Sequence, residues 1–157
     1  MQILLNAEKF FVAYQVLKAD EELSMMLMTP GIVCLSFSIE LYMKYLLALT
    51  GKTPPRDHRI LILFQSLPPK IQDEIYKKIN GEEMQFSVGN IFGTKRFNKD
   101  YSFHDAFLED IEKISDSFCK WRYSHEKTTV SFPTSFAEAF VIVLRDVGED
   151  LQTPQNT

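Results

Sequence analysis

Arg122 and His125 lie three residues apart in the stretch FCKWRYSHEK, residues 118–127, near the end of a long helical pattern. Side chains at this spacing project from the same side of a helix. A histidine transfers protons near neutral pH, and a guanidinium group can hold a phosphate through two hydrogen bonds. The pair therefore suits metal-independent RNA cleavage, in which the imidazole moves protons and the guanidinium stabilises the charge at the phosphorus.

The same two residues also have a structural interpretation, which is the commoner one for such pairs. Arg122 can form an ion pair with an acid such as Glu40 or Glu126. His125 can complete the apolar helix face that it shares with Trp121. Both interpretations stay open at this point.

A second group of candidates surrounds His58 in PPRDHRILILFQSLP. We expect a short helix from 58 to 67 with Asp57 as its N-cap. Helix N-termini bind phosphate, so His58 and Arg59 are predicted to contact an anionic ligand. Capping or packing is the more frequent role for a histidine in this position.

A third group follows between residues 81 and 100, where the helical periodicity fades and three of the six glycines occur. Lys95 and Arg96 lie beside Phe97 and shortly before Tyr101. Basic and aromatic side chains of this kind can neutralise and stack a single nucleic-acid strand. A solvated loop anchored by one phenylalanine is the simpler alternative.

No metal or cofactor is expected. The three histidines are scattered, no HxxxH or Cys/His cluster occurs, and GNIFGTK has the wrong spacing for a phosphate loop. A nucleophile elbow is also missing from the sequence.

The composition is that of one soluble domain covering residues 1–157. Hydrophobic residues make up 45% and charged residues 24%, and the net charge of −4 argues against a protein that grips long nucleic acid mainly through charge. Two cysteines without a CxxC pattern fit a reducing compartment, and the first residues lack the features of a signal peptide. We therefore expect a cytoplasmic protein.

Hydrophobic periodicity predicts an all-α, up-and-down bundle of five to six helices. In the last helix, Ser135 and Glu138 have the spacing of a capping box, and the tail 152–157 is expected to be frayed. The helices are expected at 4–20, 31–50, 58–67, 69–80, 103–126 and 135–151. In the first of them, the apolar residues near one side are Leu5, Phe10, Phe11, Tyr14 and Leu17. Ile71, Ile75 and Ile79 are expected to form the apolar edge of the fourth. One face of the fifth carries, at alternating spacings of three and four, His104, Phe107, Ile111, Ile114, Phe118, Trp121 and His125.

The segment 31–50, GIVCLSFSIELYMKYLLALT, is apolar nearly all round, with Thr29-Pro30-Gly31 as the break before it. Glu40 and Lys44 lie four residues apart on its small polar face and are predicted to pair. Each charge would cost roughly 2.5–3.5 kcal/mol at a bilayer centre, so a core helix is expected and no membrane. A helix this apolar also predicts a homodimer.

SFSIELYMKYLLALTGKTPPRDHRILILFQSLPPKIQDEI resembles the first half of a HEPN domain (higher eukaryotes and prokaryotes nucleotide-binding). In that family an apolar helix ending in ElxlKaLL…G is followed by HxLxxLfxxLP. FCKWRYSHE is similar to the RY segment late in the domain, and the resemblance covers roughly residues 30 to 127. The matching positions are Glu40, Leu41, Lys44, Leu46, Leu47, Gly51, His58, Ile60, Leu63, Leu67 and Pro68.

The resemblance implies an α-helical, usually homodimeric protein. Many members are RNases of prokaryotic defence, toxin–antitoxin or abortive-infection systems, and others bind nucleotides or partner proteins without catalysis. Catalytic members separate the arginine and histidine by four to six residues, whereas two separate Arg122 from His125. The resemblance therefore predicts a non-catalytic module that binds a nucleotide, RNA or an antitoxin-like partner. The alternative is an endoribonuclease that uses Arg122 and His125 across a dimer groove.

Overall fold

The computed structural model describes residues 2–19, 22, 26–80, 103–115 and 132–153. This part of the chain forms α-helices and no strands, which confirms the all-α prediction. The helices are α1 (Gln2–Ala19), α3 (Met28–Leu49), α4 (Ile60–Ser66), α5 (Pro69–Ile79), α7 (Phe103–Ser115) and α9 (Thr134–Gln152).

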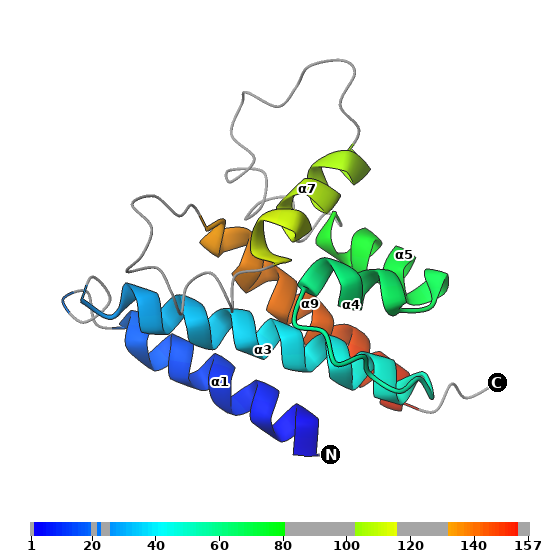
Figure 1. The fold of residues 1–157 in the computed structure, drawn as a ribbon, viewed down its shortest axis with the longest axis horizontal. Helices are drawn as coiled ribbons and strands as arrows, with labels where there is room; N and C mark the ends of the chain where they lie inside the picture. The colour runs from blue at the N-terminus through cyan, green and yellow to red at the C-terminus, as the bar shows by residue number, and fades with distance from the viewer. Residues whose placement is uncertain (1, 20–21, 23–25, 81–102, 116–131, 154–157) are drawn as a thin grey trace.

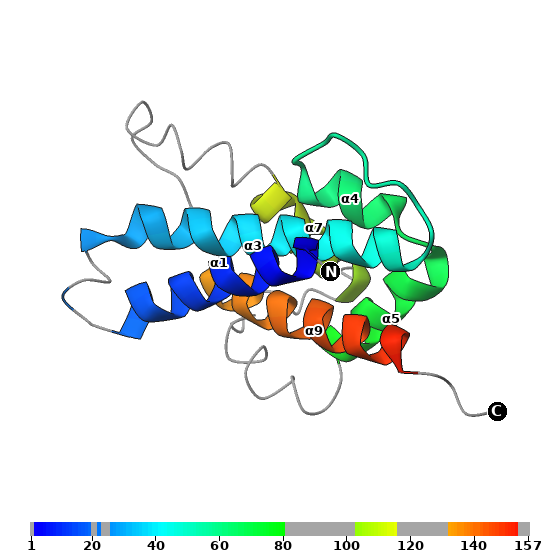
Figure 2. The ribbon, with the colours of Figure 1, turned by 90° about the horizontal axis from the view of Figure 1, so that it is seen from below.

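The three long helices α1, α3 and α9 lie side by side in both views (Figures 1 and 2). α1 runs antiparallel to α3, whereas α9 runs in the same direction as α3. The shorter helices α4, α5 and α7 lie on the other side of α3 and α9 from α1. α3 is therefore packed from several sides within one chain.

Most of the surface of α3 is buried by its own chain. Glu40 is 1% exposed, and Ser38 donates a hydrogen bond from its hydroxyl to the carbonyl of Ala7 on α1 at 2.9 Å. The apolar side chains of α3 that are no more than 1% exposed are Leu35, Ile39, Tyr42, Met43, Leu46 and Leu47. Neighbouring helices thus cover much of the apolar surface on which the dimer prediction rested, and the homodimer stays a prediction.

α3 is also the one helix of the described ranges that is long and apolar enough to cross a membrane. Length and composition alone do not separate a membrane span from the core helix of a soluble protein. In this structure, 61% of the most apolar 18-residue stretch of α3 is buried among the other helices.

Phe107 of α7 is the centre of an aromatic cluster in the core. Its ring centroid lies 5.5 Å from that of Phe64 on α4 and 5.4 Å from that of Tyr76 on α5. Phe136 and Phe140 of α9 lie at 6.1 and 6.2 Å. Edge-to-face contacts of this kind favour a fixed orientation, so the cluster holds α7 against three other helices.

The predicted apolar faces are confirmed where two helices can be checked residue by residue. Ile71, Ile75 and Ile79 form the buried edge of α5. Phe107, Ile111 and Ile114 are buried on α7, as the spacing of three and four residues predicted, while His104 at the same face is exposed. The part of the predicted helix 103–126 beyond Ser115 lies outside the described residues.

Two predicted helix starts are wrong. α3 begins at Met28, so Thr29-Pro30-Gly31 lies in its first turn instead of breaking the chain. Proline is tolerated there because the first-turn N–H groups have no intrahelical acceptor. α4 begins at Ile60, and Asp57 does not cap it.

The start of α9 also differs from the prediction. The helix begins at Thr134 after Pro133, and no side chain caps it, so Ser135 and Glu138 do not form a capping box. Glu138 instead accepts hydrogen bonds from Tyr14 and Lys18 of α1. A contact with another helix has therefore replaced the local contact that the spacing suggested. α9 extends to Gln152, the first residue of the predicted frayed tail.

Candidate functional site

A buried carboxylate lies near the middle of α3. Glu40 is 1% exposed, and its Oε1 accepts a hydrogen bond from Nζ of Lys44 at 2.7 Å. Lys44 is one helical turn further along, with 17% of its side chain exposed. The predicted Glu40–Lys44 pair is therefore confirmed, and the ammonium group compensates much of the cost of burying the carboxylate.

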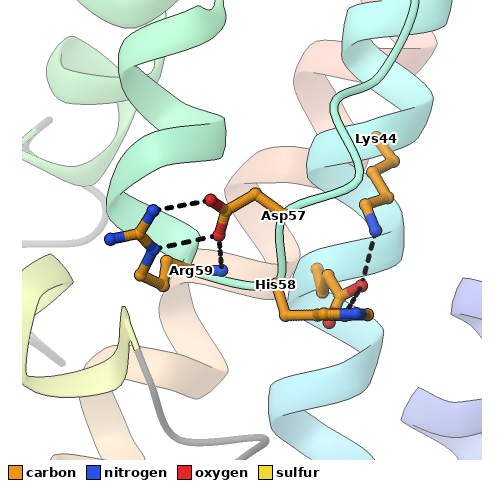
Figure 3. Close-up of polar contacts among 5 residues, drawn as sticks. Lys44, Asp57, His58 and Arg59 are labelled. Carbon is orange, nitrogen blue, oxygen red and sulfur yellow. Dashed lines mark hydrogen bonds and ion pairs between the residues drawn. The ribbon is translucent and has the colours of Figure 1, made fainter.

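His58 contacts the same carboxylate from a different segment of the chain. Its Nδ1 lies 2.9 Å from Oε1 of Glu40 (Figure 3). A carboxylate accepts hydrogen bonds only, so Nδ1 carries the proton in this contact. The imidazole belongs to the connection that precedes α4, and 53% of its side chain is exposed. Glu40 therefore fixes both the orientation and the protonated nitrogen of His58.

The second oxygen of Glu40 is different from the first. Oε2 is shielded from solvent and has no hydrogen-bond partner within the described ranges. Lys44 and His58 thus both converge on the same oxygen, Oε1, of Glu40. Buried polar atoms are nearly always hydrogen-bonded, which makes this position an exception in the core.

Asp57 and Arg59, the neighbours of His58, form a separate ion pair. Asp57 accepts hydrogen bonds from the backbone N–H of Arg59 at 2.8 Å, from its Nε at 3.1 Å and from its Nη2 at 2.7 Å. The hydrogen bonds from Arg59 hold the pKa of Asp57 well below its usual value. This contact explains why Asp57 does not cap α4: its carboxylate is turned toward Arg59 (Figure 3).

The phosphate-binding prediction for His58 and Arg59 stays untested, but the structure accounts for both residues in another way. The guanidinium of Arg59 is engaged by Asp57, and His58 is engaged by Glu40. The two side chains extend in different directions from the same segment (Figure 3).

The structure thus brings together Glu40, Lys44 and His58. Four other predicted site residues, Arg122, His125, Lys95 and Arg96, lie outside the described residues, and their roles stay predictions. The same holds for the alternative in which Arg122 pairs with Glu40.

Two surface hollows lie away from Glu40 and contain none of the predicted site residues. Both include Tyr14 and Lys18 of α1. The larger, about 370 Å³, extends to Glu138 and Ile142 of α9, and the smaller, about 160 Å³, extends to Met28 and Ile32 of α3. Within the described ranges no group of three or more histidine, cysteine, aspartate or glutamate residues is placed to hold a metal ion.

The sequence did not predict two further carboxylates that join helices. Glu8 of α1 accepts a hydrogen bond from the hydroxyl of Tyr42 at 2.5 Å and lies 3.5 Å from Nε of Arg145. Glu138 of α9 joins Tyr14 and Lys18, as described above. Burial and then the nearby carboxylates raise the pKa of both tyrosines. Neither Glu8 nor Glu138 has its tyrosine partner within its own helix, so local spacing in the sequence gave no indication of these contacts.

No protein-family model matches this chain, and neither a curated protein nor a solved structure matches it. The fold and the site together define an all-α protein with a buried carboxylate held between a lysine and a half-exposed histidine.

Proposed function

We propose that this chain is a HEPN-like helical module that binds a nucleotide, RNA or a partner protein without cutting RNA, in a prokaryotic defence or toxin–antitoxin type system. The observation that supports the proposal is the convergence of Glu40, Lys44 and His58 on one oxygen atom. These are the polar, charged positions of the ElxlK and HxLxxL patterns by which the sequence resembles that family. Residues of two separate motifs therefore meet in space.

One pair of long helices supports an up-and-down bundle of this type, since α1 and α3 are antiparallel neighbours, whereas α9 runs in the same direction as α3. The proposed module is cytoplasmic and homodimeric, and it needs no cofactor.

Two observations favour binding over catalysis. The contact between Glu40 and His58 joins α3 to the segment before α4, which is a structural role. The short spacing between Arg122 and His125 also departs from the catalytic members of the family.

The second candidate function is a metal-independent endoribonuclease that uses Arg122 and His125 across a homodimer groove. One observation favours RNA cleavage, although it concerns a histidine other than His125: His58 is half-exposed and is oriented at Nδ1 by a carboxylate. Histidines that transfer protons are commonly oriented in this way. The region around Glu40 therefore has a feature that an enzyme could use.

The deciding experiment incubates labelled single-stranded RNA with the purified protein in the presence of EDTA. Wild type, Arg122→Ala, His125→Ala and His58→Ala are compared, with His104→Ala, an exposed histidine on α7, as the matched control. We expect the RNA to stay intact with every protein. Cleavage by the wild type that is lost in His125→Ala and kept in His104→Ala would show that the endoribonuclease is correct instead.

Binding is measured on the same proteins by fluorescence anisotropy with labelled RNA and with a labelled nucleotide. Weaker binding after Lys95→Ala with Arg96→Ala, or after His58→Ala, would support a nucleotide or RNA ligand. Absence of both binding and cleavage would restrict the proposal to a partner protein.

A further inference from the structure

The outward face of α1 carries a regular row of exposed residues that no other described helix covers. We call this row the α1 seam. Successive members are separated by three, four, three, four and three residues. They are Gln2, Leu5, Lys9, Val12, Val16 and Ala19. The buried face of the same helix, with Ala7, Phe11 and Tyr14, points into the core.

The apolar members of the α1 seam are strongly exposed. The exposed fraction is 47% for Leu5, 52% for Val12 and 65% for Val16. Single exposed apolar residues are ordinary on protein surfaces. Alternating spacings of three and four are instead the pattern by which one helix packs against another along a seam. α1 therefore has two apolar faces, of which the core uses one.

A hollow adjoins one end of the α1 seam. It has a volume of about 370 Å³, and Phe11 and Ala19 of α1 line it together with Ile142 of α9. The ion pair between Lys18 and Glu138 also lines it. Ile142 is itself 45% exposed. The hollow offers a place for an apolar side chain of a helix lying along the α1 seam.

Lys9, in the middle of the α1 seam, indicates what kind of helix fits. A second copy of α1 does not fit well, because a parallel pair would place each Lys9 opposite its own copy. An antiparallel pair about the centre of the seam would bring the two lysines within about one helical turn of each other. The only acid of α1, Glu8, is engaged by Tyr42 and Arg145 and so is committed within its own chain. Like charges at such an interface are destabilising.

We propose that the α1 seam is the docking surface for an amphipathic helix of a partner protein. This partner helix has apolar residues at alternating spacings of three and four, with an acidic residue opposite Lys9. Apolar contacts supply the area, and the charge pair sets the register and excludes partners with a basic residue there. The surface is separate from Glu40 and does not depend on the function proposed above.

The test uses two synthetic helical peptides that have leucine at each position facing the α1 seam, except at the position opposite Lys9. One peptide has glutamate and the other lysine at that position, and fluorescence anisotropy measures their binding at physiological ionic strength. We expect the glutamate peptide to bind wild type about tenfold more tightly than the lysine peptide. Lys9→Glu should reverse this preference, and Val12→Asp should weaken binding of the glutamate peptide about tenfold or more.

Leu49→Asp is the matched control, because it replaces an exposed apolar residue outside the α1 seam with an acid. Circular dichroism and the melting temperature establish that each variant is folded. No binding, equal binding of the two peptides, or equal effects of Val12→Asp and Leu49→Asp would overturn the proposal. Sedimentation equilibrium tests a second copy of this chain as the occupant. Self-association of wild type that disappears in Val12→Asp would assign the α1 seam to that copy and would also overturn the proposal.

Discussion

Nδ1 of His58 and Oε1 of Glu40 lie 2.9 Å apart, although the two residues are separated by 18 positions in the chain. The contact fastens the segment before α4 onto the middle of α3. Lys44 binds the same oxygen, so the burial of one carboxylate depends on two donors from different segments. The stability of this region should therefore respond to the loss of either donor.

Lys44→Met should destabilise the fold by about 2 kcal/mol at neutral pH. The substitution leaves the carboxylate of Glu40 buried, with the half-exposed His58 as its one remaining partner in the described part of the chain, and a poorly compensated buried charge is costly. Urea unfolding followed by circular dichroism measures the change in free energy.

The matched variant is the double substitution Glu40→Leu with Lys44→Met. It removes both charges at once, so most of the loss should be recovered, to within about 1 kcal/mol of wild type. A double variant that is less stable than Lys44→Met alone would contradict this account of Glu40.

Alkaline pH should destabilise the protein through Tyr14 and Tyr42. Burial and the neighbouring carboxylates raise the pKa of both hydroxyls above the ordinary value of 10.0. The unfolded chain loses these protons near pH 10 while the folded chain keeps them, so the stabilisation is complete below pH 10 and decreases as the pH rises further. Thermal unfolding at a series of pH values above 9 should show a falling melting temperature.

Tyr42→Phe with Tyr14→Phe should reduce the steepness of this fall, because neither replacement can ionise. Tyrosine absorbance provides an independent measurement: part of it should titrate only when the protein unfolds. If all six tyrosines titrated near pH 10 with the fold intact, the assignment would be wrong.

Two helical glycines should respond in opposite directions to larger side chains. At Gly148 of α9 an added Cβ would lie 3.1 Å from Cε1 of Tyr45 on α3, so Gly148→Leu should destabilise by about 2 kcal/mol through overpacking. At Gly31 the nearest atom, Cδ2 of Tyr14, is 3.7 Å away. Gly31→Ala should therefore stabilise by about 0.5–1 kcal/mol, because it restricts the unfolded chain. Equal effects in urea unfolding would refute the close approach of α9 to α3.

The helices themselves were largely predictable because their apolar residues repeat with a helical period. Ile71, Ile75 and Ile79 illustrate this, since each is buried where the spacing placed it. The first turn of α3 and the start of α9 were not predictable from local signals. Proline is tolerated in the first turn of a helix, so Pro30 does not show whether α3 begins before or after it. Glu138 accepts a hydrogen bond from Tyr14 of α1 instead of capping the start of its own helix.

The candidate site was predictable only in its local part. The Glu40–Lys44 pair lies within one helix, where a spacing of four residues determines the geometry. The position of His58 depends on the path of the chain between α3 and α4, and this connection has no periodic pattern of apolar residues from which its path could be predicted. Leu5 shows the same limit. The apolar pattern places it near one side of the helix with Phe11 and Tyr14, yet these two are buried and Leu5 is 47% exposed.

The central position of α3 has a consequence for the synthesis of the protein. α9 comes last among the described helices, and it covers a side of α3 that α1 does not reach. Until the ribosome has released α9, a 22-residue apolar helix in the growing chain lacks part of its cover. Transiently exposed apolar surface of this kind favours aggregation and chaperone binding. Between the synthesis of α3 and that of α9, the nascent chain is thus expected to be prone to aggregation and to bind chaperones.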